Sequence, residues 1–356
     1  MAGLGMASEV HHVIELPDIG KLNVYVQGNL LSHSVAFFTV HDLGCNHYQY
    51  EDFVSHRKLQ PINERALWIS VDLPGQGDGE AELPATYTFP TIQTIAENMK
   101  PVLDHLRIDH VVLFGEGAGA NILARFAMLH DEMVLGAILI HCTGQTASFT
   151  DSLRDKLVNW KLNTTGMNPS TESFLILHRF GWDSRPITET GTEHELRQSI
   201  EHFRENLRHS INPKNLNRYI TAYMQRRTLI DRLAELKCSV LLITGALAPQ
   251  RKGCEKLYEC LRKAHKDNKN SMSTRELVVI ENVANVLAER PDKVIESMQY
   301  FIQGIGLLSH VKMQTTPLSL NRRMSMEDYD RPLGKIQLSA GFRSSLLTTD
   351  VMEDKE

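Results

Sequence analysis

The sequence predicts an α/β fold built on a mostly parallel sheet of eight strands with helices on both faces. Short apolar runs, typical of buried strands, alternate along the chain with segments of helical spacing. One long stretch, residues 150–232, offers helices and no convincing strand, and the strand pattern resumes after it. We therefore expect βαβ units interrupted by a helical cap over about residues 145–235, close to the carboxyl ends of the strands.

The chain is expected to enter the sheet through a β-hairpin. Residues 10–16 and 22–27 both have strand character, and a Pro-Asp-Ile-Gly turn separates them. Further strands are expected at residues 36–40, 66–71, 111–114, 133–140, 240–244 and 277–280.

Helices are expected from apolar side chains that recur every three or four residues. Residues 91–106 have this spacing, although Pro101 should kink the helix. A second helix should follow the strand at 111–114, and a last one should run from Pro291 to just before Gly304. In the cap, Leu196, Ile200, Phe203 and Leu207 share one helix face, which we interpret as core.

The two ends of the chain differ from the rest. Residues 1–9 show no element and are expected to be flexible, and residues 10–311 form the predicted domain. Residues 312–356 are polar and contain too few apolar side chains to offset the entropy of ordering, so we expect a disordered Ser/Thr-containing tail.

Composition excludes several classes of protein. The 356 residues carry a net charge of −5, which does not suggest binding to nucleic acid. No apolar run is long enough to span a membrane, although peripheral association stays open. The odd, scattered set of five cysteines contains no CxxC pair and favours a reducing, cytoplasmic location without cysteine-bound metal. No cofactor is expected.

The most informative motif follows the strand at 111–114. It reads Gly115-Glu116-Gly117-Ala118-Gly119 and lies between that strand and a helix. An α/β-hydrolase has Gly-x-Ser-x-Gly there, with the nucleophilic serine on a strained turn. The turn glycines remain, but Gly117 offers no attacking atom.

The expected acid and base are also missing. The loop after the strand at 240–244 is Gly245-Ala246-Leu247-Ala248-Pro249, and Ala248 occupies the place of the acid. Ala284 occupies the place of the histidine before the helix that opens at Pro291. Catalysis by a serine hydrolase requires a nucleophile, a base and an acid within hydrogen-bonding distance of one another. The sequence therefore predicts a hydrolase fold without a catalytic triad.

Several segments together resemble the N-myc downstream-regulated (NDRG) family of α/β-hydrolase-fold proteins. They occur in the family's order across roughly residues 10–310, and they read VHDLG at 40–44, VDLPGQ at 71–76, GEGAGA at 115–120, GALAP at 245–249 and FIQG at 301–304. The resemblance implies a catalytically inactive, mainly cytoplasmic protein with a phosphorylated tail and roles in signalling, stress response, differentiation or trafficking. Ala246 departs from the aspartate common there in the family.

Three residues near the motif are pocket candidates. His41 and Asp42 end one strand and could form part of an oxyanion hole, although hydrogen bonding within the turn is the structural interpretation that we favour. Glu116 could be a lone acid in a pocket or a salt-bridged one. The Gly115-x-Gly117-x-x-Ala120 spacing also fits a dinucleotide fingerprint, but no carboxylate follows the next strand to bind a ribose.

The predicted function is that of a non-enzymatic adaptor that binds protein partners through its cap or tail. Tail phosphorylation is expected at Ser325, which follows Arg322 and Arg323, with Thr316 and Ser344 as further candidates. Two alternatives stay open. One is an unorthodox hydrolase or lyase that uses Glu116 or His41, and the other is a small-ligand sensor that uses the vestigial pocket.

Overall fold

Eight strands form one sheet, in the order β1-β2-β4-β3-β5-β6-β7-β8. The computed structural model describes residues 9–145, 167, 169–181, 192–266, 273–309 and 311. The hairpin of β1 and β2 is antiparallel, β2 pairs antiparallel with β4, and all other pairs are parallel. The strands are β1 (Val10–Leu16), β2 (Gly20–Gly28), β3 (Val35–Val40), β4 (Ala66–Asp72), β5 (Val111–Glu116), β6 (Val134–Ile140), β7 (Ser239–Gly245) and β8 (Arg275–Ile280).

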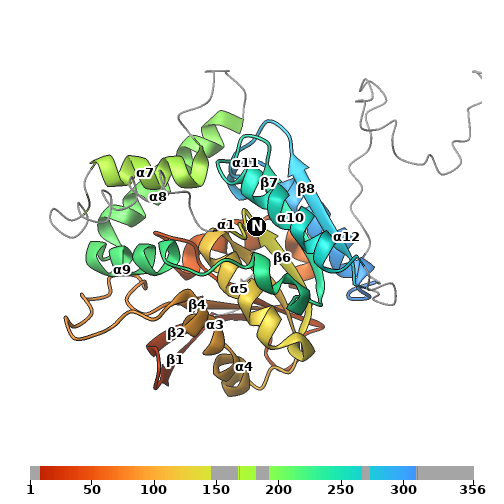
Figure 1. Cartoon of the computed structure of the whole chain (residues 1–356), viewed down its shortest axis with the longest axis horizontal. Coiled ribbons are helices and arrows are strands. Elements are labelled where there is room, and N and C mark those ends of the chain that lie inside the picture. Colours follow the sequence, from red (N-terminus) through yellow and green to blue (C-terminus); the bar gives the residue numbers. More distant parts are fainter. Residues whose placement is uncertain are drawn as a thin grey trace, which may run out of the picture. The chain divides into compact units, whose positions relative to one another are not determined.

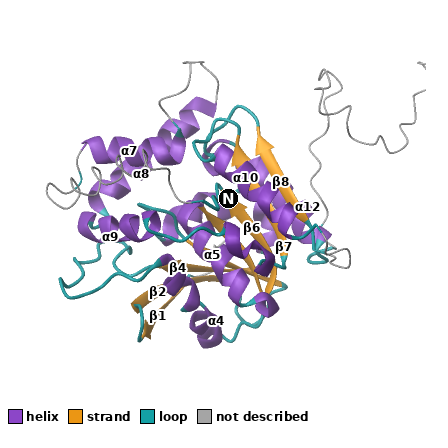
Figure 2. Ribbon diagram, viewed as in Figure 1, coloured by secondary structure: helices purple, strands orange, loops and turns teal. Residues whose placement is uncertain are grey.

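Helices cover both faces of this sheet (Figures 1 and 2). The α-helices are α1 (Glu51–Val54), α2 (Gln60–Asn63), α3 (Ile92–Glu97), α4 (Lys100–Leu106), α5 (Gly117–Leu129), α7 (Pro169–Phe180), α8 (Thr192–His209), α9 (Pro213–Met224), α10 (Arg251–Ala264), α11 (Val286–Glu289) and α12 (Pro291–Gly304). Short 3-10 turns are η1 (His47–Tyr50), η2 (Arg57–Leu59), η3 (Asp131–Met133) and η5 (Ile230–Glu235).

Two apolar clusters lie on opposite faces of the sheet because successive strand residues point to opposite sides. Leu113 of β5 belongs to the cluster covered by α3, α4, α5 and α10. Its neighbours Val112 and Phe114 belong to the cluster covered by α1, α2 and α12. Burial on both faces explains why the central strands are continuous apolar runs.

The cap predicted from the sequence is present in the described part of residues 145–235, as α7, α8 and α9. Figure 1 shows these three helices together, in green, apart from α10 and α12. The apolar face of α8 is buried: Leu196 and Leu207 are 1% and 0% exposed. The prediction that this face is core is confirmed.

One helical prediction differs from the structure, and some observed helices were not predicted. The expected kinked helix over residues 91–106 is two helices, because α3 ends at Glu97 and α4 starts at Lys100 with Pro101 in its first turn. Proline has no N–H to donate, so it fits a first turn better than a helix interior. The short η1–α1 segment and α10 were not expected from the sequence.

Within the described ranges, none of the helices combines the length and hydropathy needed to cross a membrane. The five cysteines are all free thiols, and Cys45, Cys142, Cys238 and Cys254 are buried.

Candidate functional site

The turn from β5 into α5 keeps the backbone shape of a nucleophile elbow. Gly117 has a φ of +55°, a conformation that side-chain-bearing residues rarely adopt. A Cβ at Gly119 would lie 2.0 Å from the Val40 carbonyl oxygen, so α5 starts in direct contact with β3. The sequence prediction of a retained turn agrees with this geometry.

The carboxyl group of Asp42 occupies the space where a side chain at position 117 would lie. A Cβ built on Gly117 would meet Asp42 Oδ1 at 2.3 Å and Oδ2 at 2.4 Å. The Ala118 N–H, which follows the turn, donates to Asp42 Oδ1 at 2.8 Å. Asp42 therefore fills the corner, in agreement with its expected role in hydrogen bonding near the turn.

Asp42 is buried at 4% exposure, and Gln49 accepts a hydrogen bond from its backbone N–H at 2.6 Å. Burial and, to a smaller extent, the neighbouring Glu116 raise the pKa of Asp42 to about 6, although Arg179 opposes the rise. These shifts follow from the cost of placing a second negative charge in a dry site.

Glu116 is 1% exposed and is satisfied by partners from three parts of the chain. Arg179 Nη2 lies 3.0 Å from its Oε2, and Gln49 Nε2 donates to the same oxygen at 2.7 Å. Asn285 Nδ2 donates to Oε1 at 2.9 Å. Of the two sequence-based interpretations of Glu116, the salt-bridged one agrees with the structure.

Arg179, like Gln49 and Asn285, is a partner of Glu116 that no sequence pattern indicated. It lies in the last turn of α7 and reaches from the cap into the sheet, where it contacts Glu116 and donates to Cys45 Sγ. Its guanidinium carbon also lies 5.6 Å and 5.2 Å from the ring centres of Phe180 and Phe203. No local motif marks such a residue, because the contact depends on how the cap folds over the strands.

His41 has hydrogen bonds on both ring nitrogens. Leu73 N–H donates to Nε2 at 3.2 Å, so the proton of the neutral ring is on Nδ1, which lies 2.9 Å from the Asp42 carbonyl oxygen. Burial lowers the pKa of His41, which keeps the ring neutral. Both nitrogens are thus engaged with the backbone, in agreement with a structural role.

The positions expected for the acid and the base are also packed by the cap. A Cβ at Gly181, directly after α7, would lie 3.1 Å from Ala284 Cβ and 3.1 Å from the Leu247 carbonyl oxygen, next to Ala248. The neighbouring Asn285 bonds Glu116, which precedes Gly117. These contacts place the segments that carry Gly117, Ala248 and Ala284 near one another. We call Asp42, Glu116, Gly117 and Arg179 the blocked corner.

His141 and Cys142 lie beside this region. Burial lowers the pKa of His141 to about 4, and Thr244 Oγ1 is 3.1 Å from its Nδ1. Burial raises the pKa of the Cys142 thiol to about 12, so it is a poor nucleophile. The described residues do not bring together three side chains of the metal-binding types.

Three candidate sites lie outside the described residues. These are the phosphorylation candidates Ser325, Thr316 and Ser344 in the tail, so they remain predictions.

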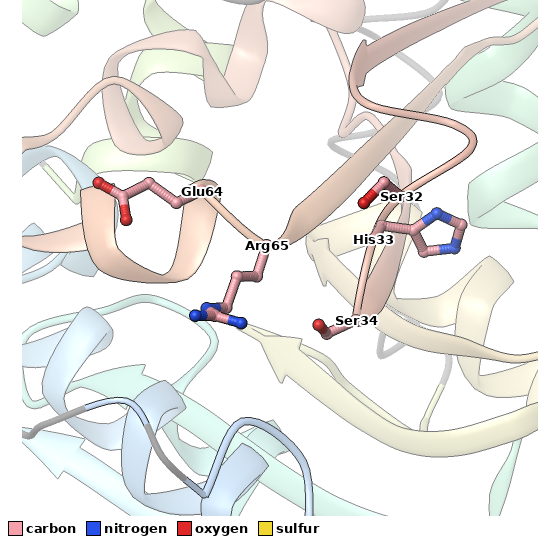
Figure 3. A pocket seen from close by; sticks show the side chains of 5 residues that line it. All are labelled: Ser32, His33, Ser34, Glu64 and Arg65. Atoms are coloured by element: carbon pink, nitrogen blue, oxygen red, sulfur yellow. The ribbon is translucent and has the colours of Figure 1, made fainter.

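Two hollows are present elsewhere on the surface. One, of about 240 Å³, is lined by Ser32, His33, Ser34, Glu64 and Arg65. Figure 3 shows Arg65 and Ser34 between Glu64 and His33. The other, of about 320 Å³, has aromatic residues from β2, β4 and η1 in its lining, together with polar and acidic ones. Neither hollow is lined by residues of the blocked corner.

Solved structures with the same architecture define the class of this chain. A thermophilic esterase from Thermogutta terrifontis matches with a TM-score of 0.64 and 17% identity, over 84% of this chain and 99% of that one. An enol-lactonase from Burkholderia xenovorans matches with a TM-score of 0.63 and 15% identity, over 82% and 100%. The fold is that of the α/β hydrolases.

Sequence relatives define the family more narrowly. Residues 11–309 match the Ndr family, and the chain belongs to this family. An uncharacterized protein of Caenorhabditis elegans is 33% identical over 90% of this chain and 92% of its own length. Protein NDRG4 of Xenopus tropicalis is 26% identical over 95% of this chain and 78% of its own length. The family predicted from the sequence motifs is confirmed.

Proposed function

We propose that this Ndr-family chain is a non-enzymatic interaction protein, an adaptor in signal transduction, stress response or differentiation. One observation supports this most: the Asp42 carboxyl group occupies the space that a nucleophile's side chain at position 117 would need. Because the domain has no room for such a nucleophile, we infer that it and its helical cap bind other proteins.

Two further features of the blocked corner support the proposal. A serine hydrolase requires an imidazole that can accept the nucleophile's proton, and His41 uses both ring nitrogens for backbone hydrogen bonds. It also requires room for an acyl group next to the elbow. Arg179 occupies that neighbourhood through its bond to Glu116.

The direct test is a broad ester panel together with a serine-reactive fluorophosphonate probe, applied to the full chain. We expect no turnover above buffer and no covalent labelling. The same panel run on the His41→Ala variant shows whether any turnover that is observed depends on His41. The alternative of an unorthodox hydrolase or lyase predicts reproducible turnover in the parent chain that His41→Ala or Glu116→Gln abolishes.

The partners are proposed to bind the cap or the tail, in the cytoplasm, and tail phosphorylation is proposed to regulate them. A phosphate adds about two negative charges, which can create or remove a docking site. Affinity capture from cytoplasmic extract with the full chain and with residues 1–311 tests the tail's contribution. Phosphopeptide mapping after kinase stimulation tests Ser325, Thr316 and Ser344, and an unmodified tail would contradict the regulatory part.

A further inference from the structure

The 320 Å³ hollow, which we call the aromatic cavity, has walls of aromatic side chains. Tyr25 comes from β2, Trp68 from β4, and Tyr48 and Tyr50 from η1. Trp68 and Tyr50 are almost fully buried, at 3% and 2% exposure, whereas Tyr48 is 48% exposed. The volume is at the small end of the range for ligand sites, which is about 300–1,000 Å³. A small molecule could therefore be held between the exposed Tyr48 and the buried rings.

The charged side chains in the lining are acidic. Glu9 and Glu51 line the aromatic cavity, and the described lining includes no lysine or arginine. The negative environment is visible at Tyr25, where burial, then Asp72, Tyr48 and Glu9 raise the pKa to about 12. An anion would be repelled here, and a cation would be attracted.

His47 adds a hydrogen-bond acceptor with no partner among the described residues. Its Nδ1 lies 2.7 Å from Asp72 Oδ2, and its backbone N–H donates to Asp72 Oδ1 at 2.5 Å. In the tautomer whose Nδ1 proton is directed at the carboxylate, Nε2 carries the free lone pair and can accept a hydrogen bond. His47 is 8% exposed and lines the aromatic cavity, and its Nε2 makes no hydrogen bond. Buried acceptors normally have a donor, so this one calls for an explanation.

We propose that the aromatic cavity binds a small primary alkylammonium ion. The ammonium group would donate to His47 Nε2 and be balanced by the carboxylates of Glu9 and Glu51. Its alkyl part would pack against the aromatic side chains of the lining. The other hollow, around Arg65, offers neither aromatic walls nor a purely acidic lining, and so provides an internal comparison (Figure 3).

The test uses n-butylammonium as the probe and 1-butanol as its neutral analogue, with ligand-observed NMR titration of the full chain. We expect n-butylammonium to bind at least tenfold more tightly than 1-butanol. Tetramethylammonium, which has no N–H to donate, is expected to bind more weakly than n-butylammonium. Equal affinity for the cation and the alcohol would overturn the proposal, and equal affinity for the two cations would overturn the role of Nε2.

Variants locate the binding. Tyr48→Ala and Glu51→Gln remove exposed lining groups, so both chains should fold, and each should weaken n-butylammonium binding roughly three- to tenfold. The matched controls are Tyr300→Ala, which removes a tyrosine that is 51% exposed on α12, and Glu64→Gln in the other hollow. The controls should bind as the parent chain does. If the control pair weakens binding as much as the cavity pair, the site is not the aromatic cavity.

Discussion

The blocked corner and the aromatic cavity are built by the same short turn, η1, and they differ in how completely their polar groups are paired. Gln49 of η1 bonds both Asp42 and Glu116 in the blocked corner. Its neighbours His47, Tyr48 and Tyr50 line the aromatic cavity, where Nε2 of His47 has no partner among the described residues.

The difference in hydrogen-bond pairing between the two regions indicates where the protein could still bind a ligand. In the blocked corner, hydrogen bonds and an ion pair from the protein already satisfy the carboxyl groups of Asp42 and Glu116. In the aromatic cavity, space and an unused acceptor remain. Tyr50 joins the two regions, because its hydroxyl accepts from Glu116 N–H at 2.9 Å while its ring lines the cavity.

The largest effect on stability is expected from removing the positive charge of Arg179 from the blocked corner. Arg179→Met would leave Glu116 buried without its ion-pair partner, which should lower the free energy of unfolding by about 3–5 kcal/mol. Urea denaturation measures the loss, and adding Glu116→Gln should restore part of it. The matched control is Arg208→Met, which breaks an ion pair to Glu172 from a side chain that is 49% exposed and should cost less than about 1 kcal/mol. Equal losses for the two arginines would show that the corner is not specially dependent on Arg179.

A second prediction separates crowding by Asp42 from backbone strain at the elbow. Gly117→Ala should cost about 3 kcal/mol, because a left-handed residue with a Cβ is strained and the methyl group would displace the buried Asp42 carboxyl. Gly79→Ala is the control, since Gly79 has a similar φ of +62° but nothing within 4 Å of its Cβ position. Thermal unfolding compares the two variants. If Gly79→Ala costs as much, strain alone explains the preference for glycine at position 117.

The pKa of Asp42 predicts a pH dependence of stability. Because its folded-state pKa is raised to about 6, the folded chain holds this proton more tightly than the unfolded chain. The resulting stabilisation is full below about pH 4 and is lost as the pH rises through about 6. Relative to Asp42→Asn, the parent chain should lose roughly 2 kcal/mol between pH 4 and pH 7. His141, whose low pKa acts in the opposite direction, is present in both chains, so its contribution cancels. A difference that does not change with pH would contradict the assignment.

The smallest expected effect is a local opening of the corner. Cys45 is buried beneath Arg179, and burial raises the pKa of its thiol to about 12, so alkylation in the native chain should be slow. Arg179→Met should speed iodoacetamide labelling of Cys45 more than that of Cys142, as measured by peptide mass spectrometry. Labelling of both thiols at equally increased rates would instead indicate global unfolding.

Much of the fold was predictable because its signals are local. The apolar runs that became β3, β5 and β7 are buried on both faces, and glycines mark the elbow. The prediction that Gly117, Ala248 and Ala284 stand at the triad positions rests on the same kind of local signal, since each follows a strand. Arg179, Gln49 and Asn285 were not predictable, because they meet Glu116 from segments far apart in the chain. The aromatic cavity escaped prediction because its residues alternate with ordinary strand positions on β2 and β4.

If Asp42 and Arg179 fill the corner, a serine, an aspartate and a histidine at positions 117, 248 and 284 should not produce hydrolysis. The most direct measurement is ester turnover by the triple variant Gly117→Ser/Ala248→Asp/Ala284→His, with its folded state verified by near-ultraviolet circular dichroism. We predict a rate no higher than that of the parent chain. Turnover by the folded triple variant that is lost when any one of the three substitutions is reversed would contradict the account.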